Sequence, residues 1–174
     1  MTAIDVQHHY VPKQLIEETN ATANCSASTS AKSRGAVCGN PADSTLSLGY
    51  MLFSGLFDRF PNLKLCALHG GGFLPYHLGR FDKEFTTGTK ARPSQSSKAP
   101  SAYLKNLYFD TLVYDVDTLE YLKAKVGGAK LMLGTDYPYT LGDWLGGENI
   151  HALKCSVAEK DANLEGNARR LLKL

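Results

Sequence analysis

No apolar run in this sequence approaches the roughly 20 residues that span a bilayer, and its first residues lack the apolar core of a signal peptide. The chain is therefore predicted to be cytoplasmic, with no membrane partner. The sequence also has no large excess of either charge, because 19 Lys and Arg balance 17 Asp and Glu and leave a formal net charge of +2. This balance, with scattered basic residues, excludes an extended surface for nucleic acid.

Cysteine is scarce and poorly spaced for metal or disulfide chemistry. The sequence has no CxxC pair, and its four cysteines lie far apart, at Cys25, Cys38, Cys66 and Cys155. Neither a zinc knuckle nor a disulfide framework is indicated, so free thiols are expected. The G-x-S-x-G turn of serine hydrolases is absent as well, which disfavours a nucleophilic hydrolase.

The most informative stretch that is present runs from residue 63 to 80, LKLCALHGGGFLPYHLGR. Its apolar residues predict a buried strand that ends at His69, and three glycines then allow a sharp turn into a helix. In parallel α/β proteins, catalytic side chains lie at the carboxyl ends of strands. His69 is therefore a candidate site residue. The alternative is a core or turn histidine bonded to backbone.

Strand and helix patterns alternate along the chain of 174 residues, which predicts one α/β domain with parallel strands. Asp115 is expected to cap the helix that ends at Gly127. A further helix is expected over residues 161–174, with Leu164, Ala168, Leu171 and Leu172 on its buried side. The expected strands lie near residues 2–6, 63–68, 107–109 and 130–133.

Residues 19–39 differ from the rest, because they are rich in Ser, Thr, Ala and Asn and have no periodicity. They predict a low-complexity loop. Order returns at Asn40, the expected N-cap of a helix with Pro41 in its first turn. The expected apolar face of this helix consists of Leu46, Tyr50, Phe53 and Phe57.

Polar residues follow the ends of all four expected strands, at Gln7 and His9, His69, Asp110 and Asp136. Parallel neighbours would bring these side chains to one edge of the sheet. Imidazole nitrogen and carboxylate oxygen are ligands of a zinc-type metal, which lowers the pKa of bound water. Two alternatives stay open: Asp136 suits a turn, and Asp110 suits hydrogen bonds to backbone groups.

Five segments carry a family pattern. They are IDVQHHYVP at 4–12, SGLFDRFPNLKLCALHGGGFLPYHLGR at 54–80, LYFDT at 107–111, LMLGTDYPY at 131–139 and GNARRLLKL at 166–174. In order and spacing they resemble the amidohydrolase-related (amidohydrolase 2) family, which includes aminocarboxymuconate-semialdehyde decarboxylase and the hydroxybenzoate-type decarboxylases. HGGG and GTDYP at this separation, preceded by DRFPNLKL, make the resemblance specific.

The resemblance implies a distorted TIM barrel with a divalent metal, commonly zinc, at the carboxyl rim. It assigns proton handling or polarisation of metal-bound water to His69, and binding or orientation of the metal to Asp136. His9 would be the second histidine of the first-strand motif, and Gln7 stands in place of its first metal ligand. The implied substrate is a small unsaturated or aromatic carboxylic acid, on which a proton replaces carbon dioxide.

The chain departs from the family pattern in two respects. Gln7 offers a neutral amide, a poorer zinc ligand than imidazole or carboxylate, and no residue corresponds to the family's middle-strand histidine. The expected fold is α/β, a partial barrel of about four parallel βα units against the eight of a complete one. Residues 1–18 would form the first unit and residues 40–174 the C-terminal half. Open strand edges would favour self-association.

These expectations lead to two functional hypotheses. The first is a metal-dependent decarboxylase, or a hydrolase, acting on an unsaturated or aromatic carboxylic acid. The second is a noncatalytic truncated or spliced remnant that at most associates with a full-length relative. The choice between decarboxylation and hydrolysis stays open, because the same metal and histidine serve either reaction.

Overall fold

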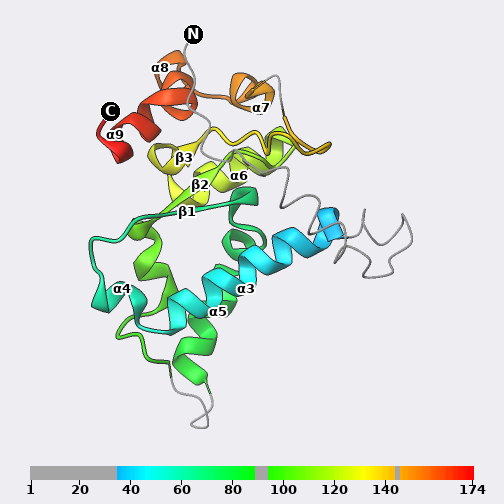
Figure 1. The fold of residues 1–174 in the computed structure, drawn as a ribbon. Helices are drawn as coiled ribbons and strands as arrows, with labels where there is room; N and C mark the ends of the chain where they lie inside the picture. Colours follow the sequence, from blue (N-terminus) through cyan, green and yellow to red (C-terminus); the bar gives the residue numbers. More distant parts are fainter. Residues whose placement is uncertain (1–34, 89–93, 144–145) are drawn as a thin grey trace, which may run out of the picture.

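The computed structural model describes residues 35–88, 94–143 and 146–174. Within these ranges, three strands form a parallel sheet in the order β1-β2-β3, and helices surround it (Figure 1). The predicted parallel α/β class is confirmed. The strand expected at residues 2–6, which would make a fourth unit, lies outside the described residues. The strands are β1 (Leu65–Ala67), β2 (Leu107–Asp110) and β3 (Leu131–Met132).

The strands share one hydrophobic core with the helices that surround them. Leu65 pairs with Leu107, and Phe109 pairs with Leu131. Leu107, Phe109 and Leu131 are fully buried, and they continue into a core that includes residues of the surrounding helices. Figure 1 shows α3 and α5 below the strands, with α7, α8 and α9 above them.

The first described helix, α3 (Asn40–Phe53), begins differently from the expectation. Asn40 is not an N-cap, because Gly39 before it already has helical backbone (φ −64°, ψ −56°) and η1 (Gly35–Gly39) forms a π-helical turn. The last residues of the expected 19–39 loop are therefore helical. Residues 19–34 lie outside the described part of the chain.

The expected apolar face of this helix is only partly right, because Phe57 is buried and Phe53 is half-buried, but the two earlier residues of the face are not. Leu46 and Tyr50 are 60% and 78% exposed, whereas Leu48 and Leu52 are buried. The helix also stops early, because Gly55 takes a left-handed φ of +70° and starts the separate α4 (Leu56–Arg59). Periodicity alone did not distinguish the two faces, since large apolar residues occur on both.

The elements between the strands follow local signals closely. Helix α5 (Leu74–Thr87) comes after β1, and η3 (Pro100–Asn106) leads into β2. Helix α6 (Val116–Val126) has the predicted cap, in which the Thr118 N–H donates to Asp115 Oδ2 at 2.8 Å. It ends at Gly127, as predicted.

The C-terminal region is more broken than the expected single helix. Leu164 and Ala168 are buried as predicted, but Leu172 is 55% exposed and Leu171 is only half-buried. Two asparagines, Asn163 and Asn167, are buried on this side instead. Asn167 Nδ2 donates to the Leu131 carbonyl at 2.8 Å and so connects α9 to β3. The elements are η4 (Gly128–Lys130), α7 (Glu148–Ala152), α8 (Val157–Asp161), η5 (Ala162–Gly166) and α9 (Asn167–Leu172).

Cys38, Cys66 and Cys155 carry free thiols, as predicted, and Cys25 lies outside the described ranges. Among the helices of those ranges, none has the length and apolar character needed to cross a membrane.

Candidate active site

The turn after β1 is built from residues with unusual backbone angles. His69 has a φ of +56°, and the three glycines that follow have φ values from +60° to +81°. The 3-10 turn η2 (His69–Gly71) thus reverses the chain at the end of the strand, and α5 starts three residues later. Histidine tolerates the left-handed region better than most side chains, but only surrounding contacts keep it there.

Asp110, at the end of β2, supplies those contacts. Its carboxylate is fully buried, where Oδ2 accepts from the His69 N–H at 2.8 Å and Oδ1 accepts from the Gly70 N–H at 2.7 Å. Oδ1 also accepts from the Leu112 N–H at 3.2 Å. The alternative role for Asp110, bonding to backbone groups, is therefore the observed one. Asp110 holds the turn that carries His69.

The position of Asp110 changes its acidity. Burial is the main cause that raises its pKa to about 7, and the negative charge of Asp136 adds to the rise. The three backbone N–H bonds act in the opposite direction, because they favour the ionised carboxylate.

This raised pKa predicts how stability changes with pH. Between 3.8 and about 7, the folded chain keeps a proton on Asp110 that the unfolded chain has released. The stabilisation that this proton provides is therefore fully present below the unfolded pKa of 3.8, and it is lost as the pH rises through the folded pKa of about 7. Urea unfolding gives the free energy of unfolding of the wild type and of Asp110→Asn at each pH in this interval. The decrease due to Asp110 should appear in the wild type and be missing in Asp110→Asn. Parallel curves would contradict the prediction.

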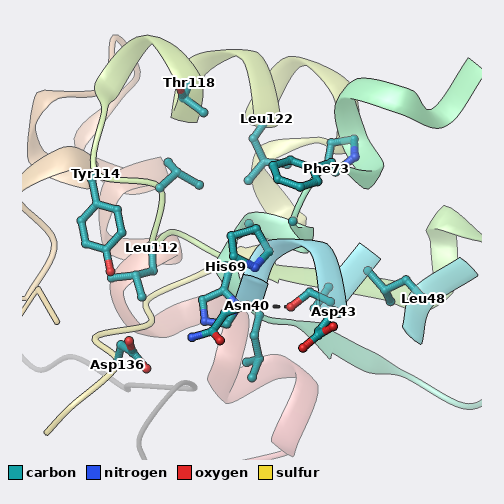
Figure 2. Close-up of a pocket in the computed structure, with 18 of the residues that line it drawn as sticks. Asn40, Asp43, Leu48, His69, Phe73, Leu112, Tyr114, Thr118, Leu122 and Asp136 are labelled. Atoms are coloured by element: carbon teal, nitrogen blue, oxygen red, sulfur yellow. Dashed lines mark hydrogen bonds between the residues drawn. The ribbon is translucent and has the colours of Figure 1, made fainter. Parts of the chain in front are cut away.

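The carboxyl ends of β1 and β3 open into one cavity of about 1320 Å³, which His69 and Asp136 both line (Figure 2). Ser44, from α3, hydrogen-bonds through its hydroxyl to His69 Nδ1 at 3.1 Å. The imidazole is therefore oriented by a residue of α3 that lies 25 positions earlier in the sequence. No sequence pattern singled out Ser44.

Asp136 follows β3 with a φ of +56° and is 8% exposed. Its carbonyl accepts from the Tyr139 N–H at 2.9 Å, so its main chain takes part in a turn, as one alternative proposed. Its side chain nevertheless lines the cavity with His69. A turn role and a site role are therefore compatible at this residue.

The cavity is acidic. Among the described residues that line it, Asp43, Asp115, Asp117 and Asp136 accompany His69, and there is no Lys or Arg. One imidazole and several carboxylates are donors that suit a divalent cation. In the described ranges, however, no three His, Cys, Asp or Glu side chains are grouped closely enough to hold a metal ion.

Two expected ligands, Gln7 and His9, lie outside the described residues. His69 and Asp136 therefore fit a metal site in the chemistry of their donor atoms, and they supply only part of a ligand set.

The model of the family described as Amidohydrolase matches residues 4–174. The chain belongs to the amidohydrolase family. Among curated relatives of this amidohydrolase chain, 2-amino-3-carboxymuconate-6-semialdehyde decarboxylase of Dictyostelium discoideum is 38% identical over 141 residues, covering 78% of the chain and 38% of the relative. The Caenorhabditis elegans decarboxylase of the same name is 32% identical over 135 residues, covering 77% and 34%. The chain thus spans little more than a third of either relative.

Solved structures of decarboxylases share the fold. 2,6-Dihydroxybenzoate decarboxylase, complexed with 2,6-dihydroxybenzoate, matches with a TM-score of 0.62 and 26% identity, over 75% of this chain and 40% of that one. A dihydroxybenzoic acid decarboxylase of Polaromonas, with bound manganese and the inhibitor 2-nitroresorcinol, matches with a TM-score of 0.68 and 22% identity, over 85% and 47%. The three-stranded sheet of this amidohydrolase chain therefore matches part of the barrel in such proteins.

Proposed function

We propose that this amidohydrolase chain catalyses metal-dependent decarboxylation of a small unsaturated or aromatic carboxylic acid. The supporting observation is that His69 and Asp136, from the ends of β1 and β3, line the same cavity. The 2-amino-3-carboxymuconate-6-semialdehyde decarboxylases of Dictyostelium discoideum and Caenorhabditis elegans, to which the chain is similar, support the reaction class. In this proposal, residues 1–18 are the first βα unit and residues 40–174 the C-terminal half of the barrel.

Asp136, His9 and Gln7 are the proposed ligands of a divalent metal, either zinc or manganese. When bound, such a metal would act as a Lewis acid toward the oxygens of the substrate. Manganese in the Polaromonas decarboxylase supports a divalent ion of this kind. The acidic lining of the cavity supports it too, because a cation would offset the carboxylate charges.

His69 is the proposed proton carrier. Ser44 holds Nδ1, so proton transfer is assigned to Nε2 on the other side of the ring. The bond between the carboxyl carbon and its neighbour breaks, carbon dioxide leaves, and the electron pair left on the neighbour takes up the proton from Nε2. Leu48, Phe73 and Leu122 also line the cavity and would bind the apolar part of the acid (Figure 2).

Metal content is the first test. After dialysis and size fractionation, we expect about one equivalent of zinc or manganese per chain by plasma mass spectrometry, since a single ligand set is proposed. Asp136→Asn should lose most of the metal, because it replaces an anionic ligand by a neutral amide. The matched control is Asp161→Asn, an exposed residue of α8, which should retain it.

Activity is then measured as carbon dioxide release from 2,6-dihydroxybenzoate and from 2-amino-3-carboxymuconate-6-semialdehyde. Metal-dependent release supports the proposal. Hydrolysis without carbon dioxide, or an inactive chain that retains no metal, would overturn it, and the second result would favour the noncatalytic remnant. Light scattering on the same fractions tests the proposed self-association.

A further inference from the structure

Three of the four non-glycine residues with positive φ in the described ranges occupy equivalent places in the fold. His69 follows β1, Tyr114 follows β2 and Asp136 follows β3, with φ values of +56°, +59° and +56°. All three line the same cavity. The fourth, Lys173, is next to the C-terminus. The strand-end argument had selected Asp110 from β2, yet Tyr114 is the β2 counterpart that lines the cavity with His69 and Asp136.

The backbone at Tyr114 is costly. A bulky aromatic residue at positive φ is a genuine outlier, and such residues persist only where neighbouring contacts impose them. Here both flanks are fixed: the Val113 N–H donates to the Thr111 carbonyl at 2.9 Å, and Asp115 caps α6 through Thr118. Strain of this kind is concentrated at binding and catalytic sites.

The Tyr114 side chain is placed to meet a ligand. It is 54% exposed, and its hydroxyl makes no hydrogen bond to any residue in the described part of the chain. In Figure 2 the hydroxyl points to the side of the cavity where Asp136 lies. Partial burial, followed by the charges of Asp136, Asp110 and Asp143, raises the Tyr114 pKa to about 12. The phenol therefore stays protonated near neutral pH and serves as a donor.

We propose that Tyr114 is a substrate-binding residue, whose phenolic O–H donates a hydrogen bond to a carboxylate oxygen of the acid bound beside His69 and Asp136. This inference rests on the proposed function and adds a recognition group to it. A neutral donor suits this position, because the described lining has no Lys or Arg to attract an anion. Hydrogen bonds to a charged acceptor are stronger than those to a neutral one.

The test uses two ligands that share a ring and differ by the carboxylate, 2,6-dihydroxybenzoate and resorcinol. Titration calorimetry on metal-loaded protein compares the wild type with Tyr114→Phe, which removes only the hydroxyl. We expect the Kd of the acid to rise about 10- to 100-fold, the worth of one hydrogen bond to a charged group. The Kd of resorcinol should stay the same.

Tyr50→Phe is the matched control, since Tyr50 is 78% exposed on α3 and does not line this cavity. It should leave both Kd values unchanged. A second variant, Tyr114→Asn, keeps a residue that tolerates positive φ, and it should weaken acid binding without lowering the urea midpoint of unfolding.

The outcomes separate this inference from the proposed function. If Tyr114→Phe weakened the binding of the acid and of resorcinol equally, or weakened neither, the proposed role of Tyr114 would be overturned. The same holds if the wild type binds neither ligand at millimolar concentration. If acid binding depends on Tyr114 but carbon dioxide is never released, the binding role stands and the proposed decarboxylation fails.

Discussion

Gly72→Ala is expected to lower the free energy of unfolding by roughly 3–5 kcal/mol, through strained backbone and overpacking together. A Cβ at this position would lie 2.2 Å from the Pro41 carbonyl oxygen and 2.6 Å from Thr45 Oγ1. The φ of +61° would also be strained for any residue with a side chain. Since one neighbour is the backbone of α3, the clash cannot be relieved by rotating a side chain.

Gly79→Ala is the matched control, because Gly79 lies in α5 and a Cβ there would meet no atom within 4 Å. Alanine is favoured over glycine inside a helix, so this variant should gain up to about 1 kcal/mol. Urea unfolding followed by circular dichroism measures both variants. Similar stabilities for Gly72→Ala and Gly79→Ala would show that α3 does not pack against the turn as described.

His69→Asn is expected to reduce kcat/KM for the proposed decarboxylation by about 10²- to 10⁴-fold, the usual worth of a positioned proton-transfer group. Asparagine tolerates the left-handed φ of +56°, and its N–H can still donate to Asp110. The turn should therefore survive while the imidazole is lost. Initial rates of carbon dioxide release give the effect.

Two further measurements show whether this loss is chemical. The free energy of unfolding of His69→Asn should stay close to that of the wild type. Ser44→Ala, which removes the bond to Nδ1, should reduce kcat less than His69→Asn does and should shift the pH dependence of kcat. If His69→Asn released carbon dioxide at the wild-type rate, His69 would not be the proton carrier.

These two predictions concern one small region, because the turn after β1 is where stability and the candidate site meet. Helix α3 supports the turn twice: Thr45 Oγ1 accepts from the Phe73 N–H at 2.7 Å, and Ser44 orients the His69 ring. Asp110 holds the same turn from β2. A packing defect between α3 and the glycines is therefore expected to displace the imidazole as well as to destabilise the fold.

Local sequence determined the elements that depend on near neighbours. The apolar run before His69 predicted β1, Asp115 predicted the cap of α6, and Gly127 predicted its end, because each signal acts within a few residues. The HGGG and GTDYP segments, through their order and spacing in the sequence, predicted the family. They also located His69 and Asp136 at the carboxyl ends of parallel strands, and the structure places these residues after β1 and β3, the two strands that flank β2 in one parallel sheet.

Only the tertiary structure decided which side chains meet. Asp110 contacts the backbone of a residue 41 positions away, and Ser44 contacts one 25 positions away, so neither role has a local signature. Burial of Leu48 rather than Leu46 depends on where the sheet lies relative to α3. Tyr114 lines the cavity because the β2–α6 connection holds it at positive φ, a choice that its own sequence preference opposes.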